Sequence, residues 1–438
     1  MEHLFQLKQR KTNIRTEIAA GLTTYCSIIY IVSVLITMLS LTGMKDTAVF
    51  SSVLVSSGIG CIIMGLLSNY PIALAPSLGV TALFVTTICG RFGYSWRAGL
   101  AAVFIAGILF LILALTGVRG AIMHAIPAHL KCAISGGTGC FLTFIGLKNS
   151  AIIVSNEQTL VTLGKIYDPE VFVTLFGIVI LLFLSVRGHK FFILKGMAAT
   201  TVVGLIMSFF SDSAGLPSFS SELLFVPNLE LNFGALTMGF RELFSSVNII
   251  VIFISIIFVD FFETTGTLIA VISHAKLPTV DGEPENVNRA MAADALASIV
   301  GAVIGAPSVS TYIESEAGIE IGGRTGLTAV TTGILLLFSI FLYPVFGLMT
   351  ECVTSPILIL VGAAMIRQFS KIDWNDPVEG LSSFATIIMM ILTYSIADGI
   401  AFGFIIYGLT ALFSGRYKEV TGLMWAMIGM FCIYFLMI

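Results

Sequence analysis

Long apolar stretches follow one another along almost the whole chain, and no other feature of the sequence limits the possible folds as strongly. Each stretch is about 17 to 25 residues long, which lets a helix cross the roughly 30 Å of hydrocarbon in a bilayer. Charged residues make up only 11% of the 438 residues, whereas about a quarter of an average globular domain is charged. The sequence therefore predicts an all-α membrane protein with about fourteen transmembrane segments and no room for a soluble domain.

The predicted spans fall into two sets, separated by a polar loop. The first set lies near residues 17–38, 47–67, 72–90, 98–117, 121–147, 170–187 and 195–210. The second lies near 247–272, 288–304, 307–322, 326–349, 354–368, 380–397 and 399–413, with a further apolar stretch at 419–438. Asp398 and Gly399 can also mark a break inside the membrane, so the side on which the C-terminus lies stays open.

Lysine and arginine lie mostly in short loops, and their distribution predicts how the chain is oriented in the membrane. Basic residues precede the first span and occupy two further loops: Lys8, Arg10, Lys11, Arg15, Arg187, Lys190, Lys195, Arg367 and Lys371. These loops and the N-terminus are predicted to be cytoplasmic, whereas the loop at 211–230, which has no Lys or Arg, should face outward. We therefore expect a multi-pass protein of the plasma or inner membrane. The net charge of −3 is too small to suggest a nucleic-acid partner.

The two sets of spans share a short motif. PIALAPSLGVTALF at 71–84 lies in the third span and IGAPSVSTYIESEAGI at 304–319 lies in the tenth, and both contain Ala-Pro-Ser. An odd number of spans separates the motifs, so the two halves would enter the membrane in opposite orientations. This pattern is typical of an inverted repeat, here of seven plus seven spans, in which two broken helices build a binding site near the midplane. A chance match of three residues is the alternative interpretation.

Residues within both motifs disfavour a continuous helix. Pro76 and Pro307 cannot donate a backbone hydrogen bond, and Val80-Thr81 and Val309-Ser310-Thr311 are poor helix formers. Non-helical backbone is tolerated inside a membrane only where protein or a water-filled cavity satisfies its polar groups. We therefore expect an extended segment that runs into a half-helix starting near Tyr312 or Ile313, with its first amides pointing to the protein centre.

Glu314 would lie in the first turn of that half-helix. An ionisable residue at this depth costs about 3 kcal/mol on insertion scales, so it usually marks a substrate or ion path. Glu316 should point elsewhere on the helix. Glu320 and Arg324 are four residues apart and are predicted to form an ion pair near the cytoplasmic end.

A second acidic cluster, FVDFFETTGTL at 258–268, lies inside another apolar span. Asp260 and Glu263 are three residues apart and share a helix face, and Thr267 lies one turn beyond Glu263. Two carboxyl groups with the hydroxyls of Thr264 and Thr267 beside them can hydrogen-bond a polar ligand and hold a proton. A polar patch between packed helices is the alternative interpretation.

Asp294, in NRAMAADALASIVGAVIG, is a third acid in an apolar span. It is equally suited to neutralise Arg289 or Arg324 or to support the site from behind. Aromatic residues adjoin these polar points, notably Phe84 after the third-span break and Tyr312 beside Glu314. A planar heterocycle could stack on such a ring while a carboxyl group binds its edge.

The sequence favours a transporter over an enzyme. It contains no HExxH, GxSxG, P-loop or CxxC motif, and its histidines lie away from the acidic clusters. The seven cysteines lie mainly inside apolar runs without paired spacing, which predicts neither disulfides nor a metal site. Acidic rings also line cation channels. Two interrupted helices with dissimilar partners, however, suit an occluded site better than a continuous pore.

Four long segments resemble the AzgA-like purine permeases of the nucleobase:cation symporter-2 group, in order and over essentially the whole chain. They are FVDFFETTGTLIAV (258–271), TYIESEAGIEIGGRTGLTAV (311–330), AISGGTGCFLTFIGLKNSAIIV (133–154) and TIIMMILTYSIADGIAFGF (386–404). The resemblance implies a core domain at 1–120 and 231–350 and a gate domain at 121–230 and 351–438. It also implies proton-coupled uptake of guanine, hypoxanthine or adenine by a homodimer without a cofactor, with rocking or elevator-type motion.

The resemblance carries over to individual acids. Asp260 and Glu263 match acids of the family's eighth span, Glu314 matches its tenth-span glutamate, and Asp294 matches a ninth-span acid. The resulting hypothesis is that the two breaks bind a neutral purine between them. It places Glu263, Glu314, Thr81, Phe84, Tyr312, Thr267 and Ser77 at the substrate, and Asp260, Glu263 and Asp294 on the proton path.

This chain also departs from the family pattern. The family usually has Asp at the position of Glu263, Gly and Met at those of Ser77 and Leu78, and Asn at that of Thr81. An Asn both donates and accepts through its amide, whereas Thr81 has one hydroxyl and a methyl group. A different substrate of the same fold, either a related heterocycle or an anion, therefore stays open, as does a cation other than the proton.

Overall fold

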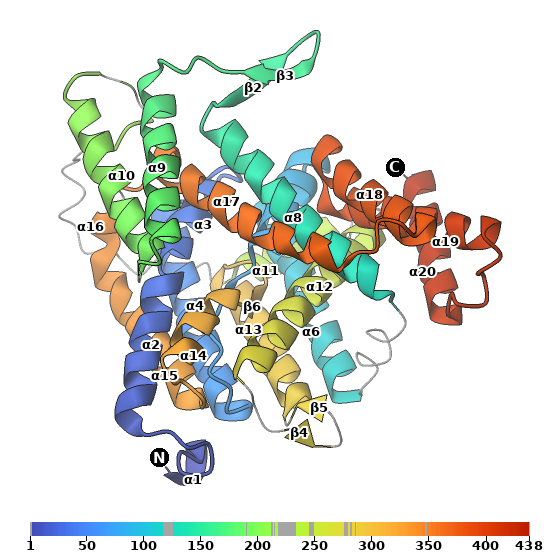
Figure 1. The fold of residues 1–438 in the computed structure, drawn as a ribbon, viewed down its shortest axis with the longest axis horizontal. Coiled ribbons are helices and arrows are strands. Elements are labelled where there is room, and N and C mark those ends of the chain that lie inside the picture. The colour runs from blue at the N-terminus through green and yellow to red at the C-terminus, as the bar shows by residue number, and fades with distance from the viewer. Residues whose placement is uncertain are drawn as a thin grey trace.

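The computed structural model describes residues 2–116, 126–189, 191–211, 213, 215–217, 234–244, 249–275, 279–280, 283–284, 286–346 and 348–437. These residues are mostly helical, as predicted (Figure 1). Before the polar loop the helices are α1 (Glu2–Phe5), α2 (Ile14–Ile28), α3 (Tyr30–Ser40), α4 (Asp46–Leu67), α5 (Leu78–Leu83), the π-helix η1 (Phe84–Arg91), α6 (Trp96–Thr116), α8 (Ala128–Asn149), α9 (Pro169–Val186) and α10 (Phe192–Ser208).

The second part of the chain continues the helical pattern. Its helices are α11 (Ala235–Leu243), α12 (Ile249–Ala275), α13 (Val287–Ile304), the short 3₁₀ helix η3 (Ile313–Ser315), α14 (Glu316–Glu320), α15 (Gly326–Phe338), η4 (Ser339–Leu342), α16 (Tyr343–Phe346), α17 (Glu351–Met365), η5 (Ile366–Lys371), α18 (Pro377–Leu392), α19 (Ile396–Phe413) and α20 (Gly422–Met437).

Among the described residues, eight helices are long and apolar enough to cross a membrane, and five shorter apolar helices accompany them. The predicted fourteen spans in two sets of seven stay a prediction. The predicted span at 121–147 corresponds to α8, although its first residues, 121–125, lie outside the described residues. Most of the loop at 211–230 and the predicted domain borders near 120 and 230 also lie outside them.

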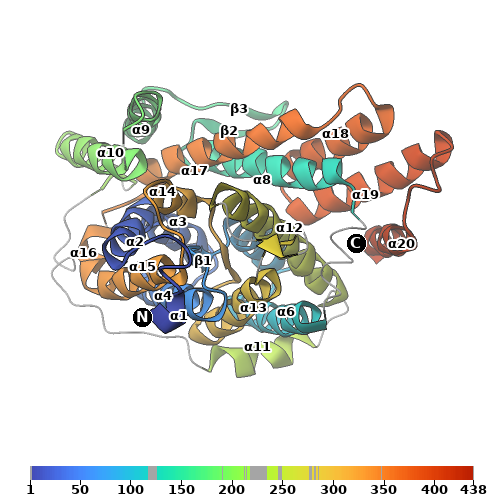
Figure 2. The ribbon, with the colours of Figure 1, turned by 60° about the horizontal axis from the view of Figure 1, so that its bottom comes forward.

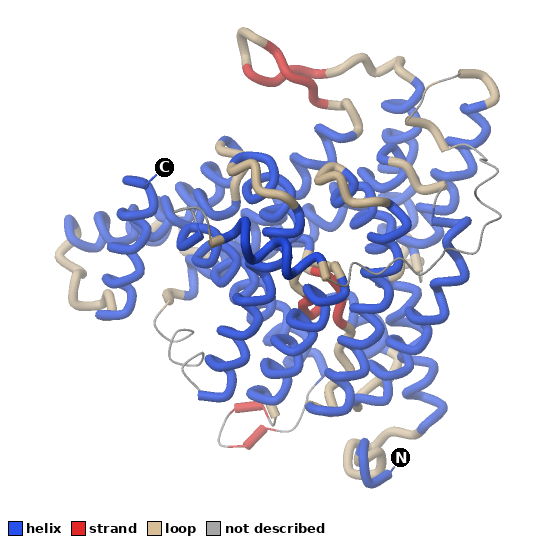
Figure 3. The backbone as a smooth tube through the Cα atoms, turned by 180° about the vertical axis from the view of Figure 1, so that it is seen from behind, coloured by secondary structure: helices blue, strands red, loops and turns tan. Residues whose placement is uncertain are grey.

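The two interrupted spans meet in the middle of the molecule (Figure 3). Strand β1 (Leu74–Pro76) runs into α5, and strand β6 (Val309–Thr311) runs into η3 and α14. The strands pair antiparallel, with Ala75 opposite Ser310. Each strand therefore satisfies backbone groups of the other, which non-helical backbone inside a membrane requires.

The breaks follow the prediction in the tenth span more closely than in the third. The half-helix after β6 begins at Ile313, as expected. Val80 and Thr81, however, lie inside α5 and not in the extended segment, which ends at Pro76. The Ser77 side chain accepts a hydrogen bond from the Val80 amide at 3.0 Å. This N-cap stabilises the first turn and offsets the low helix propensity of the two residues.

The helices form two groups (Figure 2). One group, which we call the cluster, consists of α2, α4, α5 with η1, α6, α12, α13 and α15 around β1 and β6. The other, which we call the band, consists of α8, α9, α10, α17, α18 and α19. Arg91, at the end of η1, reaches across to the band and forms an ion pair with the buried Asp398 of α19 at 2.6 Å. The Phe258 ring of α12 packs edge-on against Phe404 of α19, with ring centroids 5.8 Å apart.

Two short hairpins lie at opposite ends of the molecule (Figures 1 and 3). Strands β2 (Ile153–Asn156) and β3 (Leu160–Leu163) project at the end away from the N-terminus. Strands β4 (Thr279–Val280) and β5 (Glu283–Pro284) lie at the same end as the N-terminus. The break considered near Asp398 lies slightly earlier, because α18 ends at Leu392 and Ser395 caps α19 by accepting from the Asp398 amide at 3.2 Å.

Within the cluster, Glu17 joins α2 to the start of α15. Its buried carboxylate accepts hydrogen bonds from the Arg324 amide (2.9 Å), the Thr325 amide (3.2 Å) and the Thr328 hydroxyl (2.6 Å). The Arg324 guanidinium instead donates to the carbonyls of Ile319 and Gly323. The predicted ion pair between Glu320 and Arg324 is therefore wrong: α14 ends at Glu320, so the two residues do not share a helix.

We expect Glu17→Gln to lower the free energy of unfolding by about 2 to 3 kcal/mol, because hydrogen bonds to a buried charged group are worth about that much. The NH2 group of a glutamine would also face one or more of these hydrogen-bond donors, where the carboxylate presents an accepting oxygen. The measurement is a thermal melt of the purified protein in detergent. Glu320→Gln is the matched control, because Glu320 is exposed. An equal melting temperature for both variants would contradict the assignment of Glu17.

Candidate functional site

The site is built around the crossing of β1 and β6. The Tyr312 hydroxyl donates to the Pro76 carbonyl at 2.5 Å, and the Ser77 amide donates to the Ser308 carbonyl at 2.8 Å. The Ser315 hydroxyl accepts from the Ala73 amide at 2.9 Å. These bonds use backbone groups that neither half-helix could satisfy alone, so each break fixes the position of the other.

Glu263 reaches the crossing from the middle of α12. Its carboxyl oxygen Oε2 accepts a hydrogen bond from the Ser77 hydroxyl at 2.5 Å, and the side chain is half-buried. The first turn of α5 passes close by, since a Cβ atom added to Gly79 would lie 2.6 Å from the same oxygen. Glycine is therefore the residue that lets α5 approach the carboxyl group this closely.

Glu314 reaches the crossing from η3, in the turn after β6. Its oxygen Oε1 accepts a hydrogen bond from the Tyr30 hydroxyl at 2.5 Å. Its other oxygen, Oε2, is buried and has no hydrogen-bond partner among the described residues. Glu263 thus contacts the residue directly after β1, and Glu314 lies in the turn directly after β6, so both carboxyl groups belong to the crossing of the two strands.

The two aspartates lie behind this region and are buried. Asp260, one turn before Glu263 on α12, accepts from the Ser308 hydroxyl at 2.7 Å. Asp294 of α13 accepts from the Thr264 hydroxyl at 3.0 Å, and the Thr264 and Ser310 hydroxyls are also 3.0 Å apart. Asp260 thus ties α12 to the tenth-span break directly, whereas Asp294 ties α13 to Thr264 of α12, which in turn contacts the break through Ser310.

The remaining predicted residues differ in what they contact. The Thr267 hydroxyl donates to the Glu263 carbonyl (2.8 Å) and also contacts the Thr311 hydroxyl. The Thr81 hydroxyl is buried and has no partner among the described residues. The Phe84 ring is fully buried and packs against Gly99 of α6. Of the three, Thr81 therefore has the side chain that is most clearly left to contact a ligand.

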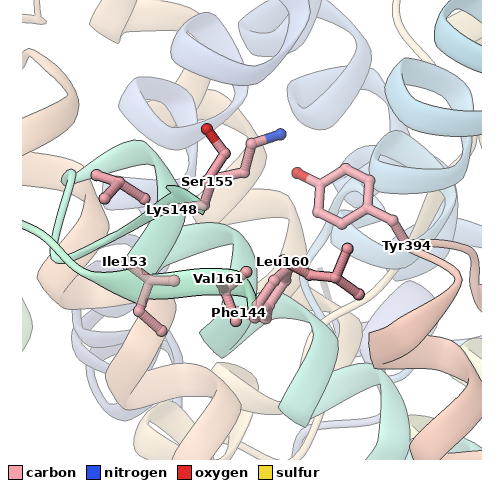
Figure 4. A pocket seen from close by; sticks show the side chains of 8 residues that line it. Phe144, Lys148, Ile153, Ser155, Leu160, Val161 and Tyr394 are labelled. Carbon is pink, nitrogen blue, oxygen red and sulfur yellow. The ribbon is translucent and has the colours of Figure 1, made fainter. Parts of the chain in front are cut away.

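Two cavities of the surface lie away from these residues. One, of about 140 Å³, lies beneath the β2–β3 hairpin and is lined by Phe144, Lys148 and Tyr394 among others (Figure 4). The Lys148 amine lies over the Tyr394 ring, 4.5 Å from its centroid. The other, of about 500 Å³, lies around Asp168 and Glu170. The acids at the crossing are better candidates for a functional site than these cavities, because ionisable groups inside an apolar protein usually mark a substrate or ion path.

Sequence reasoning missed two residues of the site, Tyr30 and Gly79. Tyr30 lies in the first apolar span, and one tyrosine in such a span is not unusual. Gly79 lies two residues after the recognised Ala-Pro-Ser motif, but only the approach of Glu263 shows why its side chain must be absent.

Comparisons with known proteins agree over the whole length of the chain. The sequence matches the permease family over residues 15–402. It is 39% identical over 446 residues to the guanine/hypoxanthine permease PbuG of Bacillus subtilis, and the alignment covers 100% of this chain and 99% of that protein. It is 35% identical over 422 residues to the adenine permease AdeQ of Escherichia coli, which covers 96% of this chain and 92% of that protein.

Solved structures share the fold at low sequence identity. The transmembrane domain of the cyanobacterial bicarbonate transporter BicA superposes with a TM-score of 0.66 at 15% identity, covering 88% of this chain and 97% of that domain. SLC26A9 superposes with a TM-score of 0.62 at 11% identity, covering 92% and 67% of the two chains. These superpositions confirm the predicted class, an all-α protein of the membrane.

Proposed function

Since this chain belongs to the permease family, we propose that it imports a purine nucleobase together with a proton. The relatives described above are named for guanine and hypoxanthine or for adenine, which supports one of these bases as the substrate. The relatives are permeases, so the activity is transport and not enzymatic catalysis, as the sequence predicted.

One observation carries the proposal. Glu263 and Glu314 both lie beside the crossing of β1 and β6, and in the described contacts each is held by a hydroxyl group and not by a basic side chain. Carboxylate oxygens accept hydrogen bonds, and a purine base presents N–H groups on its edges. A neutral base between the two carboxyl groups, with the Thr81 hydroxyl and the Tyr312 ring nearby, would satisfy both.

The proton is assigned to Glu263 and Asp260, which lie one turn apart on α12. Asp294 supports them through Thr264, which connects α12 to α13. A membrane potential of 100 mV gives about 2.3 kcal/mol for each charge moved, or roughly a 40-fold accumulation. One proton for each base is therefore enough for useful uptake.

Transport then requires the site to open to each side in turn. We assign the cluster to the core that carries the site and the band to the gate, so that one moves against the other by rocking or by an elevator-type shift. The N-terminus and the β4–β5 hairpin lie at the same end, which we assign to the cytoplasm, and the protein to the plasma or inner membrane as a homodimer.

An anion carrier is the second candidate, because the structures with the same fold include a bicarbonate transporter. An anion site would be expected to place a cationic group at the substrate, whereas this crossing presents two carboxyl groups. A cation channel is the third candidate. It would give a conductance far above the turnover of a transporter.

Uptake of radiolabelled hypoxanthine into proteoliposomes with an imposed proton gradient tests the proposal. We expect saturable uptake that collapses when a protonophore is added. Unlabelled guanine or adenine should compete, whereas uracil and bicarbonate in equal excess should not. Inhibition by bicarbonate, or flux that does not saturate, would contradict the proposed substrate class and favour the second or third candidate.

A further inference from the structure

Tyr30 makes a contact that links the first membrane span to the tenth. It is 1% exposed, and its hydroxyl donates to Glu314 Oε1 at 2.5 Å. The span that carries it continues from α2 into α3 through Ile29, whose backbone angles are helical, so Tyr30 is held on one long helix, Ile14–Ser40. The position of the phenol is thus set by a continuous helix and by complete burial of the ring.

This hydrogen bond makes the two oxygens of the Glu314 carboxyl group different from each other. Oε1 is occupied by Tyr30, whereas Oε2 is buried without a partner among the described residues. A buried acceptor without a donor is costly, and a ligand that supplies an N–H removes that cost. A ligand without a donor at this point leaves the cost in place, which is how sites built for hydrogen bonds reject analogues strongly.

We propose that Tyr30 is a positioning residue for the substrate: by holding Glu314 Oε1 it fixes Oε2 as the acceptor for one N–H of the base. This inference rests on the proposed function and assigns one step of it. Ser77 contacts Glu263 in a corresponding way at 2.5 Å, so each glutamate has one fixed oxygen. Without the Tyr30 hydroxyl the carboxyl group can rotate, and the site loses both affinity and selectivity for a ligand N–H.

The test compares Tyr30→Phe with Tyr25→Phe in proteoliposomes. Tyr25 is a matched control, because it is a tyrosine of the same span. It lies on α2, and its hydroxyl contacts Ser339 at 2.7 Å, outside the site. We expect Tyr30→Phe to raise the KM for hypoxanthine about tenfold with little change in the maximal rate, in line with loss of one hydrogen bond. Tyr25→Phe should keep the KM of the wild type.

A second measurement separates positioning from a general structural role. Hypoxanthine methylated singly at N1, N7 or N9 is tested as a competitor, and the analogue that the wild type rejects most strongly identifies the N–H in contact. We expect Tyr30→Phe to reduce that rejection at least fivefold relative to the wild type, and Tyr25→Phe to leave it unchanged. Tyr30→His, which keeps a ring and an N–H donor, should restore part of the selectivity and serves if Tyr30→Phe does not fold.

The outcomes distinguish failure of the proposed function from failure of the role assigned to Tyr30. If the wild type takes up no purine, the proposed function fails. If the wild type transports but Tyr30→Phe has the same KM and the same rejection of methylated analogues, only the role of Tyr30 fails. An equal change in Tyr25→Phe would also overturn it, because the effect would then belong to the packing of the first span.

Discussion

Replacing Glu263 by Gln is expected to abolish proton-driven accumulation of the purine base, with at least a hundredfold loss of concentrative uptake. The substitution keeps the length of the side chain and its contact with Ser77 but removes the group that can gain and lose a proton. Without that group, movement of the base is no longer linked to the membrane potential. Some binding can remain, because the amide oxygen still accepts a hydrogen bond.

The measurement has two arms. Initial rates of labelled hypoxanthine uptake are followed with and without a proton gradient, and binding to purified protein is measured separately. Glu320→Gln is the control, since Glu320 is exposed at the end of α14, the half-helix that follows Glu314. Concentrative uptake by Glu263→Gln at the rate of the wild type would refute the proton role of this carboxyl group.

A covalent tether between positions 91 and 398 is expected to stop transport completely and reversibly. Arg91 at the end of η1 and Asp398 of α19 join the cluster to the band through an ion pair of 2.6 Å. If the cluster moves against the band in each cycle, this pair must separate. The double variant Arg91→Cys and Asp398→Cys is joined by a short bis-methanethiosulfonate, which forms a disulfide with each cysteine and releases sulfinate, in a background without the seven native cysteines. The Arg91 side chain is 41% exposed, so the reagent can attach there first and then reach the buried position.

The matched tether joins two positions that belong to the band alone. Arg416 and Asp376 form an ion pair of 2.5 Å between the end of α19 and the start of α18. Arg416→Cys with Asp376→Cys, joined by the same reagent, should keep the uptake rate of the wild type. A reductant should restore uptake in the first pair. Normal transport through a tethered 91–398 pair would mean that these helices do not separate, and would exclude motion of the band against the cluster.

The sequence was informative about the site where the chemistry is exceptional in a membrane. Glu263 and Glu314 were recognisable because a carboxyl group is costly inside an apolar span, and Pro76 and Pro307 because they interrupt a helix. These features predicted that both acids lie near the breaks. In the structure Glu263 contacts Ser77 directly after β1, and Glu314 lies directly after β6, so each acid adjoins one of the paired strands.

Other parts depend on competition between contacts that the sequence does not reveal. The Thr267 hydroxyl could face a ligand, but a threonine in a helix can also donate to the carbonyl four residues earlier, and here it does so to Glu263. Arg324 could pair with Glu320, but its guanidinium donates instead to the carbonyls of Ile319 and Gly323, at and just after the end of α14. Tyr30 was missed because its partner lies more than 280 positions away in the chain, and its importance comes from that partner alone.

The pairing of β1 with β6 also limits when this protein can mature during its synthesis. Residues 74–76 emerge from the ribosome long before residues 309–311. The backbone of β1 therefore has no pairing strand while most of the polypeptide is still being made. Each unsatisfied backbone group in hydrocarbon costs several kcal/mol. A nascent chain that stops before residue 309 therefore contains an exposed, unfinished third span, and membrane quality control should degrade it faster than a chain that stops just after residue 325.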